Sequence, residues 1–211
     1  MLFRNATKIA LGTLILLTLT GCKFGVNRSL RVADGETVEG GMQTVNGSVR
    51  IGRDAKVGGA SRSVNGGITV GDSSTVGSLS TVNGSIHIAE SVRVNGDLGT
   101  INGAVESGRG TEVDGDISTI NGRLELDETE VRGSLSTHNG AVTLRGGRVH
   151  RDIVIEGRGG NKSSSELKIR LLDGAVVEGN VIVEDEARRV TVYLEDGGEV
   201  QGEIRGAEVA S

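Results

Sequence analysis

The sequence predicts an all-β fold, a single-stranded β-helix (β-solenoid) with coils of 18–19 residues. Three observations predict it: an Asn-marked phrase that recurs at that spacing, short stretches of alternating apolar residues, and a composition with 35 Gly, no Pro and few aromatic residues. A fixed short period is typical of proteins in which one unit cannot bury its apolar face alone and must stack on copies of itself.

The repeated phrase is clearest at residues 113–126, which read VDGDISTINGRLEL. Successive copies are 18 or 19 residues apart, and the first copy has Arg28 where the others have Gly. The Asn column is Asn27, Asn46, Asn65, Asn83, Asn102, Asn121 and Asn139, and the Gly column is Gly47, Gly66, Gly84, Gly103, Gly122 and Gly140. Asn-Gly is a strong turn signal because both residues tolerate left-handed backbone conformations. We therefore expect these columns to form one corner of every coil, with the Asn side chains hydrogen-bonded in a ladder along the rod. The alternative is an exposed Asn row that binds a ligand.

Apolar residues follow the Asn residues at three and five positions, except that Asn102 is followed by Val105 and Ser107. This is the period-two alternation of a short strand with one buried side. Another apolar residue lies four positions before most of the Asn residues, and a further Val opens the next segment. This pattern predicts three short strands and three corners in each coil, giving a roughly triangular cross-section. Seven such coils would form a rod about 35 Å long, since neighbouring strands lie about 4.8 Å apart.

A column of hydroxyl side chains lies two residues before each Asn: Thr44, Ser63, Thr81, Thr100, Thr119 and Thr137. This column shares strand parity with the apolar residues four positions before the Asn, which favours an inward direction. A bend in the strand would instead turn it outward, and an outward Thr row would resemble ice-binding solenoids. The pattern leaves both orientations open.

The composition suits a narrow solenoid. Its interior accommodates Val, Ile, Leu and Thr better than large aromatic side chains, Pro is excluded from hydrogen-bonded ladders, and Gly supplies tight corners. Disorder is the rival explanation of a high Gly content, but disordered chains lack a regularly spaced apolar pattern.

The N-terminal segment reads as a secretory signal: Arg4 and Lys8 precede a short apolar run that ends in Leu-Thr-Gly-Cys. That ending resembles the bacterial lipobox, which implies cleavage after residue 21 and lipidation of Cys22 as the mature N-terminus. The resemblance also implies a membrane partner through that lipid, in the cell envelope. Lys23 in place of Asp favours the outer membrane in a Gram-negative cell.

The charge and the single Cys exclude several functional classes. Residues 1–21 contain two of the 23 basic residues and none of the 28 acidic ones, so the remainder has a formal charge of −7. Nucleic-acid binding normally needs a basic surface, so no nucleic acid is expected as a partner. With Cys22 lipidated, no thiol remains for a disulfide or a metal site.

The predicted organisation has six parts. Residues 1–21 are the signal, 22–25 are the lipidated Cys and a short tether, and 26–155 form the repeat solenoid. Beyond it we expect a polar loop at 156–166, atypical terminal coils that act as a cap at 167–206, and a tail at 207–211.

No catalytic constellation is evident in the sequence. His87, His138 and His150 occupy unmatched positions and have no Cys partners, so neither a metal nor a cofactor is expected. The chain is accordingly predicted not to be an enzyme. The enzymatic alternative is an acyltransferase of the hexapeptide-repeat type, because three hexapeptides also make 18 residues, but the 19-residue coils break a strict six-residue phase.

Phrases such as VNGDL (residues 94–98), VDGDI (113–117) and VEGNV (177–181) resemble those of bactofilins, polymer-forming bacterial β-helix proteins. The resemblance covers roughly residues 26–206 and implies a right-handed β-helix with a structural role in filaments or patches. The signal and lipobox depart from that family, whose members typically act in the cytoplasm. We therefore expect a lipid-anchored envelope protein that acts structurally or by self-association through its solenoid faces. The alternative is a tethered binding module for glycan, peptidoglycan or an envelope protein.

Overall fold

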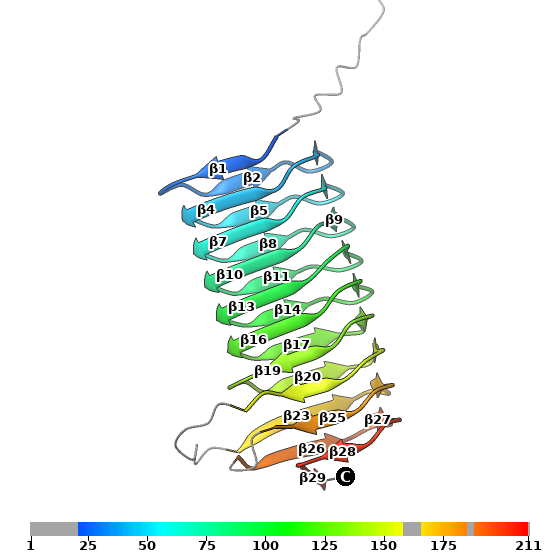
Figure 1. Cartoon of the computed structure of the whole chain (residues 1–211). Helices are drawn as coiled ribbons and strands as arrows, with labels where there is room; N and C mark the ends of the chain where they lie inside the picture. Colours follow the sequence, from blue (N-terminus) through cyan, green and yellow to red (C-terminus); the bar gives the residue numbers. More distant parts are fainter. Residues whose placement is uncertain (1–20, 158–165, 185–187, 211) are drawn as a thin grey trace, which may run out of the picture.

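A computed structural model describes residues 21–157, 166–184 and 188–210, and in these residues the chain is all-β without a helix. It forms a rod of about nine stacked turns, each with up to three short strands, and the predicted β-solenoid is confirmed (Figure 1). The signal at 1–21, except for Gly21, and most of the polar loop at 156–166 lie outside the described residues.

Three parallel sheets run the length of the rod, and each is made of every third strand. Sheet 1 contains β1 (Lys23–Gly25), β4 (Met42–Asn46), β7 (Ser61–Asn65), β10 (Leu79–Asn83), β13 (Leu98–Asn102), β16 (Ile117–Asn121), β19 (Leu135–Thr137), β22 (Ile153–Ile155), β25 (Val181–Val183) and β28 (Ile204–Arg205). Sheet 2 contains β2 (Leu30–Val32), β5 (Val49–Ile51), β8 (Ile68–Val70), β11 (Ile86–Ile88), β14 (Val105–Ser107), β17 (Leu124–Asp127), β20 (Val142–Arg145), β23 (Leu167–Leu172), β26 (Val190–Leu194) and β29 (Glu208–Ala210). Sheet 3 contains β3 (Thr37–Val38), β6 (Lys56–Val57), β9 (Thr75–Val76), β12 (Arg93–Val94), β15 (Glu112–Val113), β18 (Glu130–Val131), β21 (Arg148–Val149), β24 (Val176–Val177) and β27 (Glu199–Val200).

Each coil passes through the three sheets in turn, and the winding is right-handed (Figure 1). This is the hand expected when parallel strands with a right-handed twist are joined by crossovers. The register keeps equivalent residues of successive coils side by side, as in the pairing of Thr81 with Thr100 and of Asn83 with Asn102. Each position of the repeat therefore becomes a straight column along the rod.

The core consists of columns of Val, Ile and Leu side chains, and each column stacks from coil to coil along the rod. The strands alternate buried and exposed residues, as β5 and β8 do, and the largest fully buried side chains include Ile68, Leu98 and Leu124. The Thr/Ser column from Thr44 to Thr137 also points inward, with each side chain at most 5% exposed. This settles the orientation that the sequence left open, and it removes the premise of an outward Thr row.

Both ends of the solenoid extend further than predicted. Residues 22–25 are not a free tether, because Lys23–Gly25 forms β1 and pairs with Met42–Thr44. The tail is also partly a strand, since β29 pairs with β26. Beyond the polar loop, the terminal coils continue the same three sheets in register, with Val142 opposite Ile169 and Val149 opposite Val177. They continue the rod as further coils.

Candidate interaction surface along sheet 1

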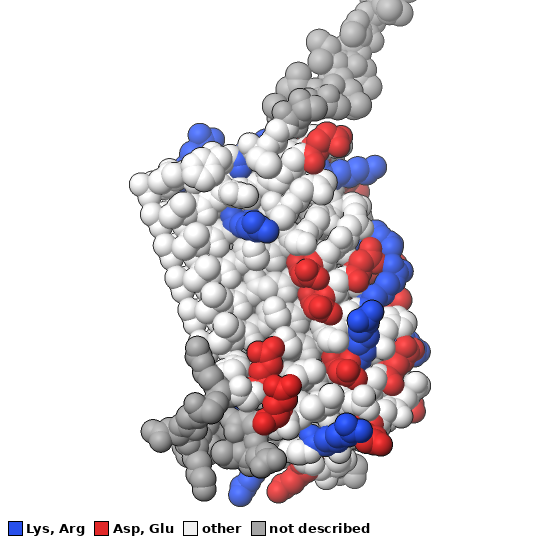
Figure 2. All heavy atoms as spheres, viewed as in Figure 1, with Lys and Arg blue, Asp and Glu red and all other residues white. Residues whose placement is uncertain are grey.

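The three outer faces of the rod differ in charge. Arg62 is the one charged residue in β4, β7, β10, β13 and β16, so the outer face of sheet 1 is nearly uncharged over these coils. Figure 2 shows this face as a broad white area, with charged side chains gathered mainly at its edges and beside it. We call the outward side of β1, β4, β7, β10, β13 and β16 the apolar face.

Two columns of side chains make up the apolar face. The stripe, one residue before each Asn, consists of Val26, Val45, Val64, Val82, Ile101 and Ile120; the central column, three residues before each Asn, consists of Phe24, Gln43, Arg62, Ser80, Gly99 and Ser118. Val45, Val64 and Ile101 are 37–41% exposed. Five stripe residues and all six of the central column line a shallow groove of about 460 Å³. A contiguous apolar strip of this kind is typical of an interaction surface.

The Asn column borders the stripe and forms the predicted ladder. Each Asn Nδ2 donates to the Oδ1 of the Asn one coil earlier, over donor–acceptor distances of 2.6–3.0 Å from Asn46→Asn27 to Asn139→Asn121. At the C-terminal end, Arg188 Nη1 donates to the last free acceptor, Asn139 Oδ1, at 2.7 Å. The ladder is therefore directional and is closed by a cation, which the sequence pattern did not predict.

The Gly column has a different physical cause from the one the sequence suggested. Only Asn27 in the Asn column (φ 56°) and Gly66 in the Gly column (φ 155°) have a positive φ, so the corner is not a repeated left-handed turn. Instead, a Cβ at these glycines would lie 1.6–2.5 Å from a carbonyl oxygen of the preceding coil. Gly is required because the stacked backbones approach too closely for any side chain.

The Thr column is tied to the Gly column by hydrogen bonds. Each buried hydroxyl from Thr44 to Thr119 donates to the carbonyl of the residue after the Asn in the preceding coil, at 2.8–3.4 Å. Thr100, for example, bonds to Gly84 O at 2.9 Å. The Thr-x-Asn-Gly phrase of each coil thus supplies the carbonyl that accepts from the buried hydroxyl of the next coil.

The left-handed residues lie at another corner, between sheets 2 and 3. The first seven coils each have such a residue there, namely Gly35, Asp54, Ser73, Ser91, Gly110, Glu128 and Gly146, with φ between 40° and 69°. No single residue type marks this corner, so the sequence pattern does not predict it. Mixed Gly, Asp and Ser residues are the available signal, because short polar side chains and Gly tolerate this conformation best.

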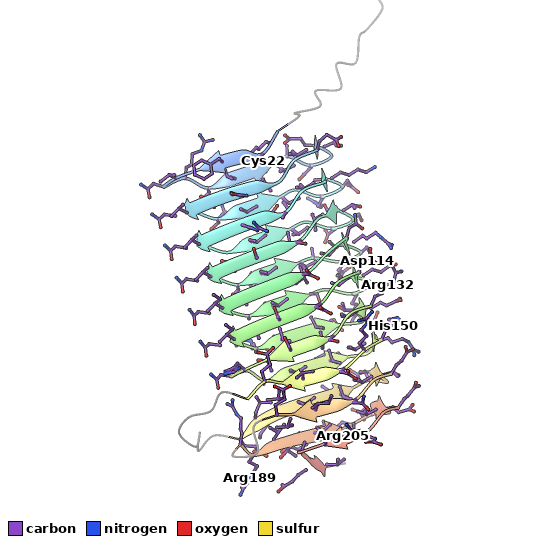
Figure 3. All side chains as sticks on the ribbon, viewed as in Figure 1. Cys22, Asp114, Arg132, His150, Arg189 and Arg205 are labelled. Atoms are coloured by element: carbon purple, nitrogen blue, oxygen red, sulfur yellow. The ribbon has the colours of Figure 1, made fainter. Side chains whose placement is uncertain are left out.

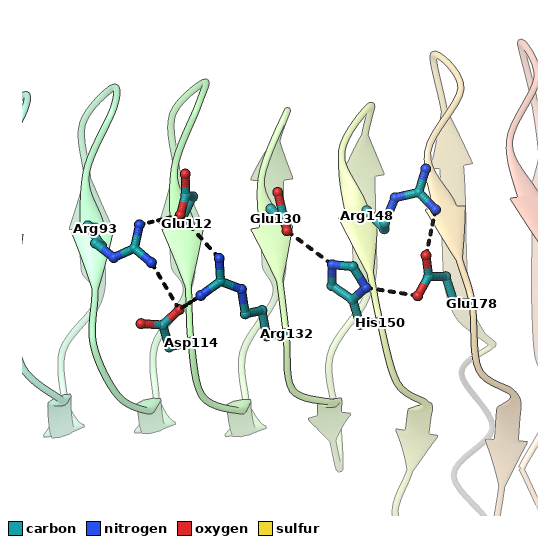
Figure 4. A network of polar contacts seen from close by, with 8 residues as sticks. All are labelled: Arg93, Glu112, Asp114, Glu130, Arg132, Arg148, His150 and Glu178. Carbon is teal, nitrogen blue, oxygen red and sulfur yellow. Dashed lines mark hydrogen bonds and ion pairs between the residues drawn. The ribbon is translucent and has the colours of Figure 1, made fainter.

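The outer face of sheet 3 carries a network of ion pairs (Figure 4). Arg93 contacts Glu112 at 2.6 Å and Asp114 at 3.5 Å, and Arg132 bridges the same two carboxylates. Farther along, Arg148 contacts Glu178 at 2.7 Å. These ion pairs join residues of neighbouring coils, so electrostatic contacts link the coils along sheet 3, whereas the apolar face is nearly uncharged.

His150 is the best-connected histidine. Its Nε2 lies 3.1 Å from Glu130 Oε1 and its Nδ1 lies 2.8 Å from Glu178 Oε2. The hydrogen bond to Glu130 is the largest influence and raises the pKa of His150 above its usual value; burial opposes this rise, and the hydrogen bond to Glu178 adds to it. The Arg148 and His150 hydrogen bonds lower the pKa of Glu178. This cluster is an ionic link between coils.

The other two histidines lie apart from His150. His87 Nδ1 is 2.8 Å from Glu106 on the outer face of sheet 2, and His138 Nδ1 is 3.8 Å from Glu156. In the part of the chain that the structure describes, no three His, Cys, Asp or Glu side chains group to hold a metal ion. The same residues include no helix long and apolar enough to cross a membrane.

Cys22 is exposed at the N-terminal end of the rod, immediately before β1 (Figure 3). Lys23 N donates to Gly41 O at 2.9 Å, so the residue next to Cys22 is already fixed to the second coil. Lys23 also pairs with Glu36 at 2.8 Å. Phe24, which is 65% exposed, begins the central column of the apolar face two residues after Cys22.

No family model, curated protein or solved structure matches the chain. The functional argument therefore rests on the residues and geometry of this chain.

Proposed function

We propose that this chain is a lipid-anchored structural protein of the bacterial cell envelope that self-associates through its solenoid surface. The observation that carries the proposal is the apolar face: a strip of exposed Val and Ile runs over six coils beside a central column whose one charged residue is Arg62, on a rod whose other faces carry many charges. The resemblance of phrases such as VDGDI to bactofilins supports a structural role and remains a proposal.

The anchoring part of the proposal rests on Cys22. This residue lies in a lipobox-like sequence, and it is exposed immediately before strand β1 of the solenoid. A chain held at Cys22 would therefore carry its rod directly at the membrane surface. Several acyl chains would hold it firmly, because each buried methylene contributes about 0.8 kcal/mol.

Anchoring is tested by growing bacteria that express the full chain with a clickable fatty acid. We expect the wild-type protein to carry the label and to be extracted from the membrane fraction by detergent. The Cys22→Ser protein should carry no label and should leave the membrane fraction. Ser211→Cys serves as the matched control, because it adds a thiol outside the lipobox and should leave labelling unchanged. An equally labelled Cys22→Ser protein would refute the anchor.

Self-association is tested by sedimentation and negative-stain microscopy of the full chain in mild detergent across a range of salt. Contacts between apolar faces should persist or strengthen as salt rises, whereas contacts through the charged faces should weaken. Assemblies that persist at high salt are expected. A monomer at every concentration would refute self-association and favour the alternative function.

The alternative is a tethered binding module, and the groove on the apolar face is the observation that favours it. The groove has the volume of a small-ligand site and is lined mainly by apolar atoms, with Phe24 at one end. A monomer that retains a peptidoglycan fragment or an envelope protein from solution, and loses it on Val64→Asp, would support this function instead.

A further inference from the structure

The central column of the apolar face is divided by size. Its three N-terminal members, Phe24, Gln43 and Arg62, are large, and its three C-terminal members, Ser80, Gly99 and Ser118, are small. The stripe beside it is uniform, with Val or Ile in every coil. The face thus has a raised half and a recessed half of equal length.

We propose that two copies of this chain pair through their apolar faces in antiparallel orientation, about a two-fold axis between the third and fourth coils. This inference rests on the proposed self-association and names its contact. The axis lies in the plane of the interface and is perpendicular to the rod. The central column of one copy therefore covers the same column of the other copy, with the coils in reverse order. Phe24 then faces Ser118, Gln43 faces Gly99, and Arg62 faces Ser80.

Every large side chain in this arrangement meets a small one. Such self-complementarity is what an isologous two-fold contact requires, because the same patch must supply both the projections and the recesses. The match holds over the whole face because sheet 1 keeps its residues in register from β4 to β16.

Parallel pairing on the same face fails for the same reason. It would place each coil against itself, so that Arg62 would meet Arg62 and Phe24 would meet Phe24. Like charges facing each other in an interface cost several kcal/mol. In the antiparallel pair each Arg62 faces the small Ser80 instead, with the two Arg62 residues offset by one coil across the axis, and each lies within a coil of the partner's Asp97, which is exposed at the edge of the face.

A second copy also fits the spacing of the face better than an unrelated partner. The stripe repeats at the strand spacing of about 4.8 Å, and only a surface with the same repeat stays in step with it over six coils. A second β-solenoid of the same sequence has that repeat by construction, and its side chains can interdigitate as those of packed sheets do.

The area of the contact makes it weak in solution. Six coils of five residues cover about 450 Å² on each copy by strand dimensions, below the area typical of stable complexes. Anchoring both copies in one membrane would raise their effective concentration and favour the pair. The stripe ends where His138 takes the place of Val or Ile, so the seventh and later coils project beyond the partner.

Paired charge variants test the register. All are made in the full chain carrying Cys22→Ser, in mild detergent at high protein concentration, and dimerisation is measured by sedimentation equilibrium. Ser80→Arg sets Arg against Arg62 of the other copy and is expected to weaken the dimer at least about tenfold. The double variant Arg62→Ser/Ser80→Arg restores a large residue opposite a small one and should return the affinity to near that of the parent.

Ser136→Arg is the matched control. It makes the same change in the same column one coil beyond the overlap, and it is expected to leave dimerisation unchanged. Circular dichroism melting of each variant shows whether the solenoid itself remains folded. Loss of dimer in Ser136→Arg equal to that in Ser80→Arg would contradict the register.

Orientation is measured by pulsed electron paramagnetic resonance on Ser118→Cys carrying a spin label. Antiparallel pairing puts the two labelled backbones about 25 Å apart, and parallel pairing puts them about 10 Å apart, from strand and sheet spacings. A distance of about 10 Å would overturn antiparallel pairing, and so would a dimer that Ser80→Arg leaves intact. In both cases the proposed self-association would stand. A monomer in every sample would overturn both.

Discussion

The coils that carry Thr-x-Asn-Gly differ from the coils that follow. In the former, from the second to the sixth coil, a buried Thr or Ser hydroxyl bonds to a carbonyl at the corner of the previous coil. In the eighth and ninth coils, the equivalent inward positions are Ile155 and Val183, and the Asn-Gly corner is gone. Both kinds of coil continue the same three sheets.

This difference shows that the Thr and Gly columns depend on each other. A buried hydroxyl stabilises the fold only while it has a hydrogen-bond partner. The seventh coil marks the change: Thr137 Oγ1 is buried without a partner among the described residues, and β19 stops at Thr137 where β16 runs on to its Asn. One coil later the hydroxyl has been replaced by a hydrocarbon side chain.

The largest expected effect comes from adding a methyl group at the corner. Gly122→Ala would place a Cβ 1.8 Å from Gly103 O, which forces stacked backbones apart, and we expect a loss of about 3 kcal/mol in the free energy of unfolding. Gly99→Ala is the control on the same sheet, because its Cβ would approach only Ser118 Oγ, at 3.3 Å. Urea unfolding followed by circular dichroism measures both. Equal midpoints would contradict the close-approach explanation.

Reciprocal substitutions in the Thr column should come next. Thr100→Val leaves Gly84 O without its donor, and Ile155→Thr buries a hydroxyl where no Asn-Gly corner exists, so each should cost about 1–2 kcal/mol. The same urea titration applies. If Thr serves only to fill space, Thr100→Val will instead be neutral or stabilising.

The direction of the Asn ladder predicts a smaller difference. Asn102→Asp removes the donor to Asn83 Oδ1 and sets two acceptors against each other, so we expect a loss of about 1 kcal/mol. Asn27→Asp should be nearly neutral, because Asn27 begins the ladder and serves there only as an acceptor. Thermal unfolding of the two variants compares them directly. A larger loss at Asn27 would reverse the assigned direction.

The ionic link at His150 should give the smallest effect, and it should depend on pH. Because the folded pKa of His150 lies above its usual 6.5, protonation stabilises the fold fully below pH 6.5, and this contribution is lost as pH rises through the raised pKa. The lowered pKa of Glu178 preserves the pair down to below pH 4.5. We expect the free energy of unfolding of wild type, from urea titration at pH 5.5, to exceed that of His150→Gln by less than 1 kcal/mol, since the pair is partly exposed.

The gap between the two proteins should close at pH 9. A difference that grows with pH would contradict the assignment of His150 as the cation of the cluster. Arg93→Gln serves as a control that breaks an ion pair of the same sheet without a histidine, so its effect should stay constant between these pH values.

The fold was largely predictable because a solenoid converts sequence period directly into columns. The spacing of Asn46, Asn65 and Asn83, and the alternation around them, sufficed for the coil, the three strands and the Asn ladder. What could not be predicted depends on contacts between coils. The close approach at Gly122 and the inward direction of Thr100 require knowing which backbone lies above and below.

The surface was less predictable than the core. The stripe residues Val45 and Val64 have the strand parity opposite to the Thr column, so their exposure became definite only with the inward direction of that column. The strand character of Lys23–Gly25 was missed because a single-copy edge strand has no complete repeat to mark it. In the ionic link, Glu130 lies 20 positions before His150, and Glu178 lies 28 positions after it. The second spacing departs from the period of 18–19 residues because the repeat is interrupted after residue 155.

The immediate start of β1 after Cys22 has a mechanical consequence. The hydrogen bonds between coils lie along the rod, so tension applied at Cys22 in that direction opens them one coil at a time instead of shearing a whole sheet. Each coil that peels away would release about 19 residues, or roughly 60 Å of extended chain. Held at Cys22, the rod would yield in steps under load and rewind when the load falls.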